Sequence, residues 1–194
     1  YMTTWVCSSD EKRQTMTYKW IYKTPDGFSD MLMNSDGEYL TGLWFEGSKD
    51  AAKHVTDCEE RRLYVFEDTI KWLDLYFAGK IPDFTPKYKL NNLTDFRREV
   101  IQCMLAIPYG ETTTYGEIAA TIAKKHGIAQ MSSRAVGGAV GWNPICIIIP
   151  CHRVVGSNHS LTGYGGGLSN KIALLNLERN DMSRFTIPKK GTAL

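Results

Sequence analysis

The chain has 194 residues, 43% hydrophobic and 23% charged, which are the proportions of an ordinary globular protein rather than a disordered or fibrous one. The longest apolar run, residues 145–150, is too short to cross a bilayer, and residues 1–13 lack the apolar core of a signal peptide. Five cysteines without framework spacing favour a reducing compartment. We therefore expect neither a secreted nor a membrane protein, and a cytoplasmic location (nuclear in a eukaryote).

Charge is divided unevenly between the two halves of the chain, although the formal net charge is only +2. Residues 1–86 hold ten Lys and Arg against fifteen Asp and Glu, whereas residues 87–194 hold thirteen against six. The positive excess in the second half predicts an anionic partner, with nucleic acid as the first candidate. Chance unevenness over two solvated surfaces is the alternative, and charge alone does not decide between them.

The pattern in residues 1–86 predicts a small sheet domain with one packed helix. Residues 27–45 alternate polar and apolar side chains and are bounded and interrupted by Asp-Gly turns, which is typical of a hairpin or short meander. Residues 63–77 repeat apolar side chains at helical spacing, and Gly79 ends that helix. Residues 81–93 hold two prolines and no periodicity, so we expect a linker there. The buried face of the hairpin is predicted to consist of Met31, Met33, Leu40, Leu43 and Phe45.

Residues 87–194 are predicted to form a second, mostly helical domain. Thr94 caps a helix that runs to residue 105, and Thr114 with Glu117 has the form of a capping box before another helix. Gly127 breaks the chain, and a third helix begins at residue 133. Two short helices across a turn make a helix-turn-helix. The predicted fold class is therefore α/β (α+β), with an N-terminal sheet domain and a C-terminal helical one.

The helix at residues 133–139 consists mainly of Ala, Gly and Val. Small side chains let a helix backbone come close either to another helix in the core or to a narrow groove in nucleic acid. Arg134, which stands at the start of this helix beside Ser132 and Ser133, favours contact with phosphate or base. Tight internal packing is the alternative that the pattern leaves open.

The most informative stretch is residues 145–153, Ile-Cys-Ile-Ile-Ile-Pro-Cys-His-Arg. Its β-branched residues predict a buried strand that delivers Cys151 to the end of a rigid element. A neighbouring His and Arg lower the pKa of a thiol and make it a nucleophile. Because adjacent side chains rarely contact each other, we expect His152 to act through a water and to need an acidic partner. A buried structural cysteine is the alternative, and it is our interpretation of Cys146.

Two further patterns point to ligands only weakly. Residues 163–167 are glycine-rich but lack the Lys and Ser/Thr of a P-loop, so a loop lining a pocket fits better than a nucleotide site. His54 and Cys58 stand four residues apart and, with Cys7, offer three zinc ligands without a clear fourth. We therefore expect no metal and no cofactor.

Together these motifs resemble the O6-alkylguanine-DNA alkyltransferase family. The resemblance runs from about residue 96 to residue 178 and rests on Pro-Cys-His-Arg at 150–153, Asn-Pro at 143–144, Arg-Ala-Val-Gly-Gly-Ala at 134–139 and Gly-Tyr at 163–164. It implies DNA repair by direct reversal: the second helix of the helix-turn-helix binds the minor groove of double-stranded DNA, the damaged guanine flips out, and its O6-alkyl group moves irreversibly to the protein's own cysteine. Each molecule would act once, as a monomer. O4-alkylthymine as a substrate and cooperative binding along DNA are left open.

The resemblance also implies a role for each matching residue. Cys151 would accept the alkyl group, His152 would deprotonate Cys151 through a water, and Glu178 would orient His152. Asn143 would shape the turn before the cysteine, and Tyr115 would donate a proton or hydrogen bond to guanine N3. Contacts with the base are implied for Tyr115, Val154, Tyr164, Gly165 and Lys171. Contacts with DNA are implied for Arg134, which would fill the gap in the base stack, and for Ser132, Ser133, Ala135 and Gly138.

Three rival functions fit the residues less well. A Cys-His hydrolase would need an oxyanion hole and a better placed base than the adjacent His152. A sequence-reading regulator would carry polar side chains on its second helix, and residues 135–139 offer none. Alkyltransferase-like proteins, which sense lesions without transfer, replace the acceptor cysteine, whereas this chain retains Cys151. The small Gly165 further predicts that bulkier alkyl groups such as benzyl are tolerated.

Overall fold

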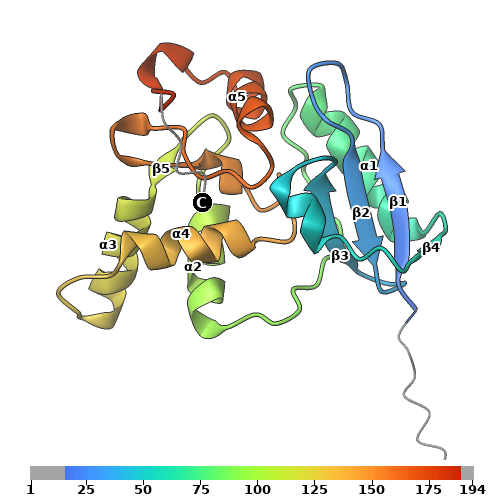
Figure 1. The fold of residues 1–194 in the computed structure, drawn as a ribbon, viewed down its shortest axis with the longest axis horizontal. Helices are drawn as coiled ribbons and strands as arrows, with labels where there is room; N and C mark the ends of the chain where they lie inside the picture. Colours follow the sequence, from blue (N-terminus) through green and yellow to red (C-terminus); the bar gives the residue numbers. More distant parts are fainter. Residues whose placement is uncertain (1–15, 189–194) are drawn as a thin grey trace, which may run out of the picture.

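The computed structural model describes residues 16–188, which form a sheet half and a helical half (Figure 1). The sheet has the order β3-β2-β1-β4, in which β1, β2 and β3 are antiparallel neighbours and β4 runs parallel to β1. Helix α1 packs against it, as the sequence predicts. Residues 1–13 and Cys7, on which two sequence predictions rest, lie outside the described residues. These elements span β1 (Tyr18–Tyr22), β2 (Met31–Ser35), β3 (Leu40–Phe45), β4 (Glu59–Glu60) and α1 (Tyr64–Phe77).

The predicted hairpin is β2 and β3, and its predicted buried face is confirmed. Met31, Met33, Leu40, Leu43 and Phe45 expose no surface at all. Strand β1 is not predicted from the sequence. Three of its five residues are half-buried and a fourth is exposed, so buried and exposed side chains do not alternate along it. The sheet therefore has one more central strand than the sequence predicts.

The connection between the halves is attached to the sheet rather than free. The Leu40 amide donates to the Lys87 carbonyl at 2.9 Å, and the Lys89 amide donates to the Leu40 carbonyl at 2.9 Å. On the same strand, Leu43 donates to the Pro144 carbonyl at 2.8 Å and accepts from the Cys146 amide at 3.0 Å. One hydrophobic core runs through both halves. Strand β3 thus fastens the segment that leads to Cys151.

The helical half follows the predicted capping signals. Thr94 accepts a hydrogen bond from the Arg97 amide, and both hydrogen bonds of the Thr114–Glu117 capping box are present. Gly127 ends the next helix with a φ of 64°. Helix α4 runs three residues beyond the predicted end, to Trp142. The α-helices of the helical half are α2 (Asp95–Leu105), α3 (Tyr115–His126), α4 (Ser133–Trp142) and α5 (Leu168–Leu177), and its strands are β5 (Thr113–Thr114) and β6 (Val154–Val155).

Short 3-10 helices complete the described chain. They are η1 (Lys49–Lys53), η2 (Cys151–Arg153), η3 (Ser157–His159) and η4 (Met182–Arg184). No helix in residues 16–188 has the length and apolar character needed to span a membrane.

The predicted strand before Cys151 is wrong. Residues 145–149 form a buried turn in which Ile147 has a φ of 68° and the Ile149 amide donates to the Ile145 carbonyl at 3.1 Å. The side chain of Asn143 makes this turn possible. Its amide nitrogen donates to the carbonyls of Ile145 and Ile149 at 3.3 and 2.9 Å, and its oxygen accepts from the Ile145 amide at 3.0 Å. Buried backbone groups therefore find partners without a strand ladder.

Candidate functional site

Cys151 opens the short helix η2 directly after this turn and is 6% exposed. Hydrogen bonding from Cys146 lowers the pKa of the Cys151 thiol, and Asn143 and the charge of Lys171 act in the same direction. Burial and the charge of Asp50 oppose them, and the net direction is downward. The pKa of Cys146 itself is raised, which agrees with its interpretation as a core residue. A thiol of lowered pKa supplies more thiolate, the nucleophilic form.

His152 and Glu178 form a buried hydrogen-bonded pair. Nε2 of His152 lies 2.7 Å from Oε1 of Glu178, and both side chains are inaccessible to solvent. Burial lowers the pKa of His152, against the pull of Glu178. Burial alone would raise the pKa of Glu178, but hydrogen bonds and charges from His152 and Arg153 bring it to about 2. A carboxylate next to Nε2 assigns the ring proton to that nitrogen, which leaves Nδ1, buried without a protein partner, as the basic nitrogen.

Two further side chains hold Glu178, and neither is predicted from the sequence to do so. Arg153 forms a fork on the carboxylate, with Nε 2.9 Å from Oε2 and Nη2 2.9 Å from Oε1. Tyr76, on α1, donates from its hydroxyl to Oε1 at 2.7 Å. Tyr76 occupies an apolar position of an amphipathic helix, so no signal in the sequence distinguishes it from an ordinary core residue.

The residues predicted to contact the base gather around a buried lysine. Lys171 on α5 has no exposed surface, and its ammonium donates to the carbonyls of Val154 and Thr162 at 2.7 and 3.4 Å. It also lies 5.7 Å from the centre of the Tyr164 ring. Burial lowers the pKa of Lys171 to about 8, opposed by the nearby Cys151. Lys171 therefore ties the glycine-rich loop, which includes Gly165, to β6.

A cavity of about 800 Å³ adjoins this cluster. Tyr115, Gly163 and Gly165 line one part of it, and the small residues of α4 line another. The Tyr115 hydroxyl donates to the Gly163 carbonyl at 3.5 Å. Burial, followed by the charge of Cys151, raises the pKa of Tyr115 to about 12, so the phenol keeps its proton and acts as a hydrogen-bond donor.

Helix α4 has one buried face and one exposed face. Val136, Ala139 and Val140 are buried, so small-residue packing explains one face. On the other face a Cβ atom built at Gly138 would meet nothing within 4 Å. Ser132 caps the helix by accepting from the Ala135 amide at 3.2 Å. The exposed residues of the cap and the helix are Ser132, Ser133, Arg134, Ala135, Gly138 and Gly141.

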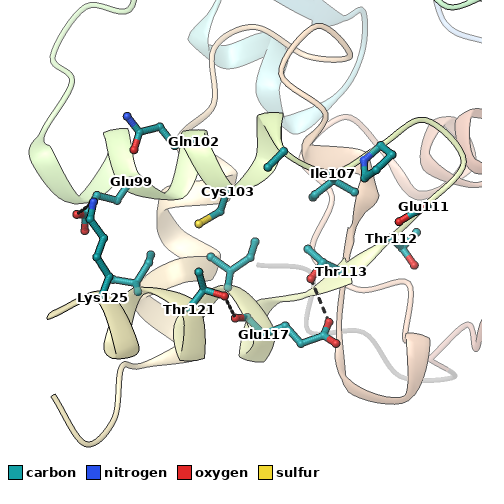
Figure 2. A pocket seen from close by; sticks show the side chains of 14 residues that line it. Glu99, Gln102, Cys103, Ile107, Glu111, Thr112, Thr113, Glu117, Thr121 and Lys125 are labelled. Atoms are coloured by element: carbon teal, nitrogen blue, oxygen red, sulfur yellow. Dashed lines mark hydrogen bonds and ion pairs between the residues drawn. The ribbon is translucent and has the colours of Figure 1, made fainter. Parts of the chain in front are cut away.

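A second cavity, of about 490 Å³, lies between α2 and α3 and holds none of the predicted site residues (Figure 2). Three of its four charged side chains already have partners: Glu99 pairs with Lys125 at 2.7 Å, and Glu117 accepts a hydrogen bond from Thr113 at 3.0 Å. Burial raises the pKa of Cys103, so this thiol is a poor nucleophile. The cavity therefore lacks the chemistry found around Cys151.

The three zinc-ligand candidates do not form a described site. Cys7 lies outside the described residues, His54 packs edge-on against Trp44, and the thiol of Cys58 contacts the Val55 carbonyl at 2.9 Å. Within residues 16–188, no three His, Cys, Asp or Glu side chains are grouped so that they could hold a metal ion.

The fold and the site define a class of protein: an α/β protein with a helix-turn-helix beside a buried cysteine of lowered pKa, which is followed by a hydrogen-bonded His–Glu pair. Residues 95–180 match the sequence model described as the 6-O-methylguanine DNA methyltransferase, DNA binding domain. The methylated-DNA–protein-cysteine methyltransferase of Haemophilus influenzae is 39% identical over 165 residues, which cover 85% of this chain and 88% of that protein. The chain belongs to this family.

Other relatives and solved structures agree with this assignment. The Mycobacterium tuberculosis methylated-DNA–protein-cysteine methyltransferase is 49% identical over 115 residues, 59% of this chain, and the match spans 66% of that protein's length. A crystal structure of the M. tuberculosis O6-methylguanine methyltransferase covers 90% of this chain and 97% of its own, with 38% identity and a TM-score of 0.69. The structure of the M. tuberculosis protein in complex with DNA covers 88% and 94%, with 37% identity and a TM-score of 0.68.

Proposed function

We propose that this protein repairs double-stranded DNA by transferring the alkyl group of O6-alkylguanine to Cys151, as a methylated-DNA–[protein]-cysteine S-methyltransferase. The observation that carries the proposal is the buried hydrogen bond of 2.7 Å between His152 and Glu178, directly after a thiol of lowered pKa. This arrangement supplies a nucleophile and an oriented base beside a cavity large enough for a nucleobase.

The chemical step balances with the groups of this site. The thiol proton passes to Nδ1 of His152 through a water, and the Cys151 thiolate attacks the alkyl carbon. The carbon–O6 bond breaks, its electron pair passes to O6, and the proton held by His152 returns to the guanine. Tyr115 stabilises the leaving base by donating a hydrogen bond to N3. A carbon–sulfur bond remains that no second nucleophile of the site cleaves, so each molecule acts once.

DNA reaches the site through α4. A base inside a duplex is out of reach of Cys151, so the damaged guanine must flip into the cavity. The exposed small residues of α4, Ala135 and Gly138, allow close approach to the minor groove. Contacts in this groove depend little on the base sequence, which suits a protein that must find a lesion in any sequence. Arg134 lines the cavity and fills the gap in the base stack. Ser132 and Ser133 contact the phosphates.

The proposed division of labour follows the two parts of the chain. Residues 87–194 carry DNA binding and alkyl transfer, and residues 1–86 form a supporting domain that contributes Tyr76 to the site. We expect a cytoplasmic monomer. Four cysteines are free within the described residues, which suits a reducing compartment.

The test is intact-mass spectrometry after incubation with a duplex that contains one O6-methylguanine. The expected result is a gain of one CH2 unit per protein, located on Cys151 by peptide mapping and saturating at one. Cys151→Ser abolishes the gain, whereas Cys103→Ser, the control at a free thiol in the second cavity, retains it. Tight binding to the lesion without a mass gain would instead identify a lesion sensor, the alternative function.

A further inference from the structure

Helix η1 brings a lysine of the sheet half to the wall of the site cavity. Lys49 is exposed and lines the cavity of about 800 Å³ together with Arg134 and Gly141 of α4. The sequence predicts no DNA contact for residues 1–86, in which acidic side chains outnumber basic ones. A cation from this acidic half therefore shares a cavity with the face of α4 that is proposed to bind DNA.

The position of η1 is fixed by contacts with both α4 and the glycine-rich loop. The Lys53 ammonium donates to the Gly141 carbonyl near the C-terminal end of α4, and the Asp50 amide donates to the Gly165 carbonyl at 3.2 Å. The Asp50 carboxylate fills the space beside Gly165, where a Cβ atom would overlap it. In Figure 1, η1 (cyan) lies beside the C-terminal end of α4. Lys49 is therefore held near this end of the helix.

The wall of the cavity is positively charged near both ends of α4. Asp50 is the one acidic residue among the described residues that line it, and Lys53 pairs with its carboxylate at 2.8 Å. Within residues 16–188, neither Lys49 nor Arg134 takes part in an ion pair. Arg134 precedes Gly141 by seven residues, which is about 10 Å along a helix. Two cations therefore flank the exposed face of α4 with their charges available to a partner.

We propose that Lys49 binds a phosphate of the DNA duplex that lies along α4, so that the sheet half holds the DNA directly. A duplex carries one negative charge for about every 1.7 Å of its axis, so DNA seated on α4 has phosphates within reach of both ends of the helix. A lysine contacts phosphate as a point charge on a flexible stem, without reading the base. The inference rests on the proposed function, because it concerns the DNA that α4 binds.

The experiment measures the Kd of an undamaged duplex by fluorescence anisotropy at several salt concentrations. Each phosphate contact contributes about 0.9 to the slope of log K against the logarithm of salt concentration. Lys49→Met should therefore reduce the magnitude of this slope by about 0.9 and weaken binding about fivefold to tenfold near 0.1 M salt. Lys49→Arg, which keeps the charge, should retain the wild-type slope and affinity.

A second comparison tests whether the contact is independent of the lesion. In a Cys151→Ser background, which prevents transfer, Lys49→Met should weaken binding to a duplex with O6-methylguanine by the same factor as binding to the undamaged duplex. A phosphate contact carries no information about the base, so the two factors should be equal. A loss confined to the duplex with the lesion would overturn the phosphate contact.

The matched control is Lys80→Met, which removes the same charge from an exposed lysine of the sheet half that does not line the cavity. It should leave the slope unchanged, which separates a local contact from the effect of net charge. An unchanged slope in Lys49→Met, or an equal reduction in Lys80→Met, would overturn the role of Lys49 alone. Absence of any duplex binding by the wild-type protein would instead overturn the proposed function.

Discussion

Tyr76 and Glu178 are joined by a hydrogen bond of 2.7 Å, although 102 residues separate them in the chain. The bond crosses from α1 in the sheet half to the residue that ends α5 in the helical half. The same carboxylate oxygen accepts from Tyr76 and from His152. The orientation of His152, the proposed general base, therefore depends on the packing of both halves.

Tyr76→Phe tests this dependence, because it removes the hydroxyl while the ring can remain stacked on Trp72. We expect a loss of about 1.5–3 kcal/mol in the free energy of unfolding, the value of a hydrogen bond to a charged group. Without this donor, Glu178 attracts the His152 proton more strongly and the pKa of His152 rises. The acid limb of the transfer rate should therefore move to higher pH.

Tyr109→Phe is the matched control for this prediction. Its hydroxyl donates to the Leu177 carbonyl at 3.2 Å and not to the Glu178 carboxylate. We expect a similar or smaller loss of stability with no displacement of the pH profile. Equal profiles for Tyr76→Phe and wild type would show that Tyr76 only supports the fold.

Glu178 makes the free energy of unfolding depend on pH. Its pKa is about 2 in the folded protein against an ordinary value of 4.5, so the folded state favours the carboxylate. The resulting stabilisation, about 3 kcal/mol, is fully present above the unfolded pKa and is lost as pH falls toward 2. In denaturant unfolding at several pH values, wild type should exceed Glu178→Gln above about pH 5, and the difference should close toward pH 2. A difference that is constant with pH would contradict this assignment.

Lys171 helps to keep the Cys151 thiol acidic. Lys171→Met removes a buried positive charge that lowers the pKa of Cys151, so that pKa should rise. The measurement is the rate of iodoacetamide alkylation of Cys151 against pH, with the modified peptide identified by mass. Lys125→Met, which removes a charge paired with Glu99 outside this site, should leave the titration unchanged.

Substitutions at Gly138 test DNA binding separately from folding. A Cβ atom there would meet nothing within 4 Å and the position is exposed, so both Gly138→Ala and Gly138→Leu should fold. Gly138→Ala should gain about 1 kcal/mol of stability, since glycine is unfavourable inside a helix. Gly138→Leu should weaken duplex binding by about tenfold or more, because the minor groove is narrow. Fluorescence anisotropy at fixed salt, together with thermal unfolding, checks both effects. Undiminished binding by Gly138→Leu would place the DNA elsewhere.

The sequence predicts best those features that arise within a few residues. The capping box at Thr114, the helix end at Gly127 and the buried face of the hairpin all follow from local chemistry, and all are present. The error at residues 145–149 has a physical cause. β-Branched composition reports burial, and a buried strand and a buried turn share it. The hydrogen bonds of Asn143 decide between them.

The sequence by itself determined the order of the motifs, the helices that present them and the chemical nature of Cys151, His152 and Glu178. The tertiary structure alone decided that Tyr76 reaches Glu178 and that Asp50 fills the space beside Gly165. Helix α1 and η1 carry no local mark of these contacts. Burial, hydrogen bonding and the pKa of a side chain depend on what packs around it, and here the partners come from segments more than a hundred residues apart.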